Sequence, residues 1–305
     1  MFTRKIIFDD LTNLETYIWA PLEEQNIKGV IQIIHGMAEY MPRYNEFANF
    51  LVKNGYLVVG CDLYAHGLSA PSIDQIGIVT RYDFMMSIIQ SVKKVYDEMV
   101  CRFQDVPHYL FAHSMGSMVA QRYIELYPDD FEKVILSGTD YPGVKYALSK
   151  KITRLFGSKN YIKYSKFIDS LGAGGFNKYF KSEHPKYAWL SRDLSTAIKY
   201  ENDPYCGRMF PVDYYYSLSN MMRISKKKDN ILKINPGILI QIMSGYQDPV
   251  GGFGKGPTKL NNMYNKSGIA SRLILYSGAR HECINELPGT KEKFFNDVLD
   301  FYNNL

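Results

Sequence analysis

The chain has 305 residues, of which 46% are hydrophobic and 22% are charged, so it can bury a sizeable core and is not an intrinsically disordered protein. The formal net charge of +5 is modest for this length, and the basic stripe typical of a nucleic-acid-binding protein is not expected. The one run of three lysines, at residues 226–228, lies between two apolar stretches. We interpret it as a solvated loop, ahead of the alternative of a contact with anionic lipid headgroups.

The cysteine pattern and the first residues predict a protein of the cytoplasm. The four cysteines are widely scattered, and no two have the spacing of metal ligands or of a small disulfide scaffold: Cys61, Cys101, Cys206 and Cys283. Charged side chains within residues 1–10 leave no apolar segment for a signal peptide, and no stretch reaches the ~18 consecutive apolar residues of a membrane span. We therefore expect a soluble, intracellular protein with reduced thiols.

Strands and helices alternate along the first part of the chain and again near its end. Most of the strand-length runs are continuously apolar, as expected for strands that are buried on both faces. The expected strands are residues 3–8, 15–19, 29–34, 56–61, 108–111, 133–136, 237–243 and 271–276. The expected helices are residues 44–53, 81–100, 114–127, 259–265 and 290–302. This order predicts an α/β fold with a mostly parallel, doubly wound sheet.

The alternation is interrupted over residues 139–235, which contain aromatic, lysine-rich helical pieces and no buried strand pattern. A segment of this length is too long for a structureless loop. We interpret it as a helical cap, or lid, inserted into an α/β core of residues 1–138 and 236–305. Its aromatic residues favour packing within the cap over a lipid groove, although both uses are expected: Tyr161, Tyr164, Phe167, Phe176, Tyr179, Phe180 and Tyr214 to Tyr216.

A candidate nucleophile, Ser114, stands between an expected strand and an expected helix. A serine on such a strained turn needs small residues two positions before and two positions after it. Gly116 meets this requirement, and Ala112 stands where the pattern commonly has glycine. The N-terminus of the following helix favours negative charge that develops at the serine.

A serine hydroxyl attacks poorly unless a base takes its proton, and histidine titrates near the working pH. His281, in the loop after the strand 271–276, is the expected base, ahead of the remaining histidines, His66, His108, His113 and His184. Asp248, which follows the strand 237–243, is expected to hold the imidazole and completes the order Ser, Asp, His. Asp140, which follows the preceding core strand, is the rival for this role.

Acyl transfer also needs hydrogen-bond donors that face the developing oxyanion. The backbone N–H groups of Met115, which follows the nucleophile, and of Met37, in the turn after the strand 29–34, are the expected donors. His35 begins this turn, and we interpret it as a structural histidine that holds the turn.

Five segments carry a resemblance to a known family: HGMAEY (35–40), DLYAHGLSA (62–70), AHSMG (112–116), GYQDPVGG (245–252) and GARHECINE (278–286). They span most of the chain except the cap. On these segments the chain resembles the monoacylglycerol lipase and lysophospholipase group of α/β hydrolases. The resemblance implies the α/β-hydrolase fold, a triad of Ser114, Asp248 and His281, oxyanion donors at Met37 and Met115, and a lid that admits acyl chains. Residues 202–206 match a family segment near the substrate pocket only weakly.

We therefore expect a serine hydrolase that cleaves a single-chain lipid ester, such as a monoacylglycerol or lysophospholipid, through an acyl-enzyme and without a metal or organic cofactor. The expected partners are a lipid-like or other ester and, transiently, a membrane surface that the cap contacts; the oligomeric state is left open. Small-ester hydrolysis, acyl transfer, aminopeptidase activity and a catalytically silent binding protein are the alternatives. Dehalogenases and epoxide hydrolases are disfavoured because they have aspartate in place of Ser114.

Cys283 lies two residues after His281, and this proximity predicts that the enzyme is sensitive to thiol reagents.

Overall fold

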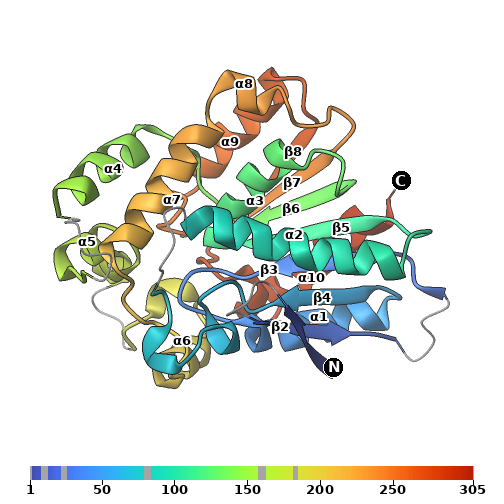
Figure 1. Cartoon of the computed structure of the whole chain (residues 1–305), viewed down its shortest axis with the longest axis horizontal. Helices are drawn as coiled ribbons and strands as arrows, with labels where there is room; N and C mark the ends of the chain where they lie inside the picture. Colours follow the sequence, from blue (N-terminus) through green and yellow to red (C-terminus); the bar gives the residue numbers. More distant parts are fainter. Residues whose placement is uncertain are drawn as a thin grey trace.

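The computed structural model describes residues 2–7, 13–21, 26–78, 84–156, 163–180 and 185–304. Its centre is an eight-stranded sheet with the strand order β1-β2-β4-β3-β5-β6-β7-β8 (Figure 1). The strands are β1 (Phe2–Ile7), β2 (Asn13–Trp19), β3 (Val30–Ile34), β4 (Leu57–Cys61), β5 (His108–His113), β6 (Lys133–Ser137), β7 (Leu239–Gly245) and β8 (Ser271–Tyr276). The pairs β1–β2 and β2–β4 are antiparallel and all other pairs are parallel, which confirms the predicted mostly parallel sheet.

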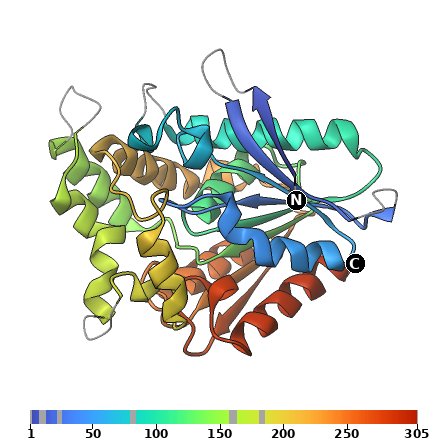
Figure 2. The ribbon, with the colours of Figure 1, turned by 90° about the horizontal axis from the view of Figure 1, so that it is seen from below.

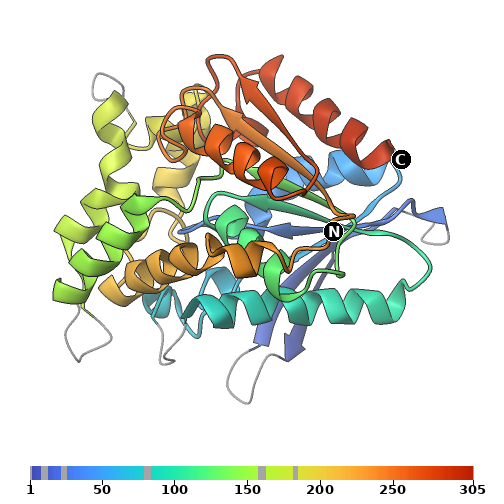
Figure 3. The ribbon, with the colours of Figure 1, turned by 90° about the horizontal axis from the view of Figure 1, so that it is seen from above.

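Helices cover both faces of this sheet. The first face carries α1 (Asn45–Lys53) and α10 (Thr290–Asn303), which lie side by side in Figures 2 and 3. The opposite face carries α2 (Phe84–Arg102), α3 (Met115–Leu126) and α9 (Lys255–Lys266). Because side chains alternate along a strand, Ile31 and Ile33 of β3 pack on the first face while Val30 and Ile34 pack on the second. The sheet is therefore doubly wound, with a hydrophobic core on each side.

The described residues of the segment between β6 and β7 form helices joined by loops, and we call residues 139–235 the cap. Its elements are α4 (Val144–Phe156), α5 (Lys166–Leu171), η5 (Ala173–Phe180), η6 (Ala188–Leu190), α6 (Leu194–Asn202), α7 (Val212–Ser225) and α8 (Lys228–Ile231). Most of the cap lies at one end of the sheet in all three views (Figures 1–3). Helices α4 and α7 pack against each other there.

Most element bounds lie within two residues of the expected ones, and the exceptions have local reasons. Helix α9 begins at Lys255, four residues before its expected start, because Pro257 in the first turn needs no intrahelical partner for its missing N–H. Helix α2 begins at Phe84; residue 81, its expected start, lies outside the described residues, as do Tyr161 and His184 of the cap. Among the described helices, none is both long and apolar enough to cross a lipid bilayer.

Candidate active site

Ser114 stands at the turn between β5 and α3, where the backbone is strained. Its φ of 54° and ψ of −124° lie in a region that non-glycine residues rarely occupy, and such strain is concentrated at functional sites. The turn is tight because α3 starts close to β3: a Cβ atom added at Gly116 would lie 2.4 Å from the carbonyl oxygen of His35 and 2.5 Å from that of Ile34. Only glycine therefore fits at residue 116, whereas Ala112, inside β5, is accommodated fully buried.

His281 lies between Ser114 and Asp248. Its Nε2 atom is 2.8 Å from Ser114 Oγ, and its Nδ1 atom is 2.9 Å from Asp248 Oδ2. The backbone N–H of Val250 donates to Asp248 Oδ1 at 2.8 Å, which fixes the carboxylate. His281 and Asp248 are both buried. Asp248 comes from the loop after β7 and His281 from the loop after β8. The structure thus brings together the three residues that the sequence singles out.

The environment of His281 sets its protonation. Burial lowers the pKa of His281, but the Asp248 carboxylate and its hydrogen bond outweigh burial, and the pKa is raised above the usual value. The imidazolium that forms when His281 takes a proton is therefore stabilised by the neighbouring carboxylate.

Asp140, the rival acid, has other partners. Its Oδ2 atom accepts a hydrogen bond from the Tyr146 hydroxyl at 2.7 Å and lies 2.5 Å from Lys145 Nζ. Burial raises the pKa of Asp140, while Lys145 opposes that shift. The structure therefore places Asp248, and not Asp140, against His281.

Met37 and Met115, the expected oxyanion donors, both line the cavity that contains Ser114. Met115 is the first residue of α3, and Met37 lines the same cavity as Ser114. A Cβ atom added at Gly36 would lie 3.0 Å from Ser114 Cβ, so the loop that carries Met37 lies directly against the nucleophile. Among the described residues neither N–H group has a hydrogen-bond partner, which leaves both available to a ligand.

The remaining described histidines have structural partners. The Leu63 N–H donates to His35 Nε2 at 2.9 Å, so His35 connects the turns after β3 and β4, as its structural interpretation requires. Burial lowers the pKa of His35 to about 4 and that of His66 to about 3, and both are neutral at physiological pH. His113 Nδ1 lies 3.4 Å from Ser137 Oγ, and burial lowers the pKa of His113 to about 4. His108 begins β5 and contacts the Phe103 carbonyl.

Cys283 is buried, and its position disagrees with the reactivity expected from the sequence. Burial raises the pKa of the thiol well above its usual value, so little thiolate forms near neutral pH. Reaction with thiol reagents is therefore disfavoured at this residue in the folded protein.

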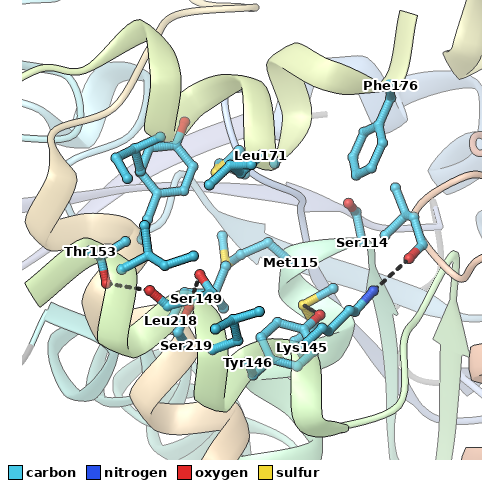
Figure 4. A pocket seen from close by; sticks show the side chains of 18 of the residues that line it. Ser114, Met115, Lys145, Tyr146, Ser149, Thr153, Leu171, Phe176, Leu218 and Ser219 are labelled. Atoms are coloured by element: carbon cyan, nitrogen blue, oxygen red, sulfur yellow. Dashed lines mark hydrogen bonds between the residues drawn. The ribbon is translucent and has the colours of Figure 1, made fainter. Parts of the chain in front are cut away.

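A cavity of about 370 Å³ leads away from Ser114 between α3 and the cap helices (Figure 4). Most of its wall is apolar, and the wall includes Met118, Ile152, Ile168, Leu171, Phe176, Trp189, Leu218 and Val250. In Figure 4, Ser114 and Phe176 lie toward one side, while Ser149 and Thr153 lie toward the other. Lys145 is the one charged residue among the described residues that line the cavity. Within the described part of the chain no cluster of histidine, cysteine or acidic side chains is arranged to hold a metal ion.

The sequence predicts no role for three charged residues that lie beside the site: Glu39, Arg43 and Glu282. Glu39 and Glu282 fall inside the segments HGMAEY and GARHECINE, but nothing local distinguishes them from solvated loop residues. Arg43 contacts Glu282 across 239 positions of the chain, and a single sequence gives no signal of that contact.

The mostly parallel sheet, its flanking helices and the serine at the strained turn after β5 define an α/β-hydrolase. Residues 25–288 match the model of the Hydrolase_4 family, described as serine aminopeptidase, S33. The chain belongs to this family.

Relatives and solved structures agree with this assignment. The chain is 27% identical to the probable lysophospholipase L2 of Haemophilus influenzae over 118 residues, which are 39% of this chain and 37% of that protein. It is 25% identical to a monoacylglycerol lipase of Mycolicibacterium smegmatis over 121 residues, 40% of each protein, so both matches span less than half of the relative. A carboxyl esterase from Bacillus coagulans, solved with glycerol, superposes with a TM-score of 0.87 over 99% of this chain and 98% of that chain, at 21% identity. The expected resemblance to this group of α/β hydrolases is confirmed.

Proposed function

We propose that this protein is a serine carboxylic-ester hydrolase that acts on single-chain lipid esters, such as monoacylglycerols or lysophospholipids. The observation that carries the proposal is the hydrogen-bonded chain from Ser114 through His281 to Asp248 at the wall of an apolar cavity. The names of the lysophospholipase and monoacylglycerol lipase relatives point to the same substrate class. The cytoplasmic location remains a prediction.

His281 takes up a proton and gives it away again in each of the two halves of the reaction. The Ser114 hydroxyl loses its proton to His281 Nε2 as Oγ bonds to the ester carbon, and the N–H groups of Met37 and Met115 bind the resulting oxyanion. The intermediate collapses when the bond to the alcohol breaks, and His281 returns its proton to the departing alcohol oxygen. Water then attacks the acyl-enzyme in the same way, and the fatty acid and the free serine are released. Asp248 stays ionised and stabilises the imidazolium.

The cavity favours an acyl chain over the alternatives. An aminopeptidase needs an acidic group for the substrate amine, and the described residues of the cavity wall include no aspartate or glutamate. Small esters would leave much of an apolar cavity of about 370 Å³ unfilled. Acyl transfer to an alcohol other than water uses the same residues and differs only in the acceptor.

Filling the side of the cavity that lies away from Ser114 tests the assignment of substrate class. Ser149 of α4 and Ser219 of α7 both line the cavity, and the Ser219 hydroxyl donates to Ser149 Oγ at 2.9 Å. We expect Ser149→Phe to lower kcat/KM for a long-chain monoacylglycerol by at least about tenfold, since the added ring excludes methylenes of the acyl chain and each buried methylene contributes about 0.8 kcal/mol. A four-carbon ester should be hydrolysed at about the wild-type rate. Ser149→Ala, which removes the hydrogen bond without adding volume, is the matched control. Equal losses for both esters in the phenylalanine variant would refute an acyl-chain site at this position.

We also propose that the cap contacts anionic membranes. The surface of α4 and α5 exposes five large apolar side chains, Val144, Leu148, Leu155, Phe167 and Leu171. Four exposed cations lie on the same helices or just before them: Lys151, Arg154, Lys163 and Lys166. Leu148 and Leu171 also line the cavity, so the cavity reaches the surface within this patch. An exposed apolar surface that also carries cations is suited to the interface of an anionic bilayer, where each cation contributes about 1 kcal/mol.

Vesicle co-sedimentation tests this contact. Leu155 is 84% exposed and lies outside the cavity, so Leu155→Glu should leave the chemistry intact. We expect it to weaken binding to vesicles of phosphatidylcholine mixed with phosphatidylglycerol about tenfold, because burying one leucine contributes about 1.5–3 kcal/mol. Leu232→Glu, on an exposed leucine at the end of α8, is the control and should bind as the wild type does. Unchanged binding of the Leu155 variant would exclude this surface.

A further inference from the structure

Three buried charged side chains form a bridge between the loop of Met37 and the loop of His281. Arg43 donates from Nη1 and Nη2 to the two carboxylate oxygens of Glu282, at 2.8 and 2.7 Å, and Nη1 also donates to Glu39. The side chains are 12% exposed for Arg43, 4% for Glu39 and 2% for Glu282. One guanidinium therefore joins two loops that are far apart in the sequence.

The Glu39 end of this bridge holds the oxyanion loop. Glu39 Oε1 accepts hydrogen bonds from the Gly36 N–H at 2.5 Å and from the Tyr44 hydroxyl at 2.9 Å. Gly36 directly precedes Met37 and lies against Ser114. Because Glu39 binds the Gly36 N–H, it fixes the direction of the chain that enters Met37, and so the direction of the Met37 N–H.

The Glu282 end holds the histidine loop. Glu282 follows His281 directly, and its side chain also accepts a hydrogen bond from Asn285 Nδ2 at 2.9 Å. The backbone N–H of Glu282 donates to the Leu190 carbonyl at 2.7 Å. Movement of the Glu282 side chain would therefore be transmitted to the imidazole next to it.

We propose that Arg43 is a positioning residue that sets the distance between the oxyanion donors and His281. The proposal rests on the ester hydrolysis proposed above. A buried ion cluster is a poor source of stability, because desolvation offsets much of the attraction between the charges. A bidentate arginine–carboxylate pair does, however, fix geometry in two directions at once. In this site, fixed geometry matters because misplacement of a catalytic group by about 1 Å costs about 100-fold in rate.

The same residues influence the charge of the base. The charged and titratable groups that act on His281 are Asp248, Glu282 and Glu39, together with the neutral His113, whose ring centre lies 4.7 Å away. After the effects of burial and Asp248, the carboxylates of Glu282 and Glu39 raise the pKa of His281 further. Removal of the Glu282 charge should therefore lower the pKa of His281.

Kinetics of Arg43 variants test the positioning role. We expect Arg43→Met to lower kcat 10- to 100-fold while KM changes less than about threefold, and Arg43→Lys, which keeps the charge but loses the planar fork, to recover part of kcat. Arg122→Met is the control, because Arg122 pairs with buried Glu125 at 2.7 Å at similar exposure, on α3 and outside the site. It should lower thermal stability without changing kcat. If Arg43→Met raises KM and leaves kcat unchanged, the positioning role is wrong.

The pH profile of Glu282→Gln gives a readout that a loss of stability would not produce. We expect the acidic limb of kcat/KM to move to lower pH, since a less basic His281 stays neutral to lower pH. An unmoved limb combined with an unchanged kcat would overturn the proposal. This variant and Arg43→Lys carry the test if Arg43→Met does not fold. If Ser114→Ala retains full activity, the proposed function itself is wrong. If Ser114→Ala is inactive but the Arg43 and Glu282 variants behave as the wild type does, only the positioning role of Arg43 is wrong.

Discussion

Replacing Ser114 with alanine should lower kcat for ester hydrolysis by about 10⁶-fold, the scale of a lost nucleophile in a serine triad. The Oγ atom lies 2.8 Å from His281 Nε2, and alanine leaves the base with no hydroxyl to activate. Hydrolysis of a soluble nitrophenyl ester, followed under saturating substrate, measures the effect.

The matched control is Ser91→Ala. Ser91 is a buried serine of α2 whose hydroxyl donates to the Ile88 carbonyl at 2.7 Å, so its loss should affect stability but not kcat. If Ser114→Ala and Ser91→Ala retained the same activity, Ser114 would not be the nucleophile.

Asp248→Asn should lower kcat about 10⁴-fold, because an asparagine neither stabilises the imidazolium nor selects the required tautomer of His281. The residual activity should also have its acidic limb at lower pH. The Asp248 carboxylate raises the pKa of His281 in the wild type, and without it the imidazole stays neutral to lower pH.

Asp140→Asn is the comparison that distinguishes the two acids. Asp140 is bound to Tyr146 and Lys145, so its loss should reduce thermal stability while kcat stays within about tenfold of the wild type. A 10⁴-fold loss in the Asp140 variant, with an active Asp248 variant, would reverse the assignment.

The fold was predictable because its signals are local. Most of the parallel strands are short, mainly apolar runs. Strands such as β3 and β6 are mainly apolar because helices cover both of their faces. The nucleophile turn was predictable as well, since Gly116 is required by the contact with the His35 carbonyl and shows in the sequence.

The choice of acid and the bridge were not predictable in the same way. Asp140 and Asp248 both follow core strands, β6 and β7, which are neighbours in the sheet, and only the path of the later loop brings Asp248 to His281. The contact of Arg43 with Glu282 depends on two loops meeting in space, for which neither residue carries a local pattern. The cap helices are short and pack on one another, so periodicity predicts that they are helical but not which residues line the cavity.

The measurement that tests the central claim most directly is the partitioning of a shared acyl-enzyme. A long-chain monoacylglycerol and the nitrophenyl ester of the same fatty acid are hydrolysed in the presence of methanol, and the ratio of fatty acid to methyl ester is determined by mass spectrometry. Both substrates form the same acyl group on Ser114, so we expect one ratio for both and loss of both products in Ser114→Ala. Ratios that depend on the departing alcohol, or no products from the monoacylglycerol, would contradict the account.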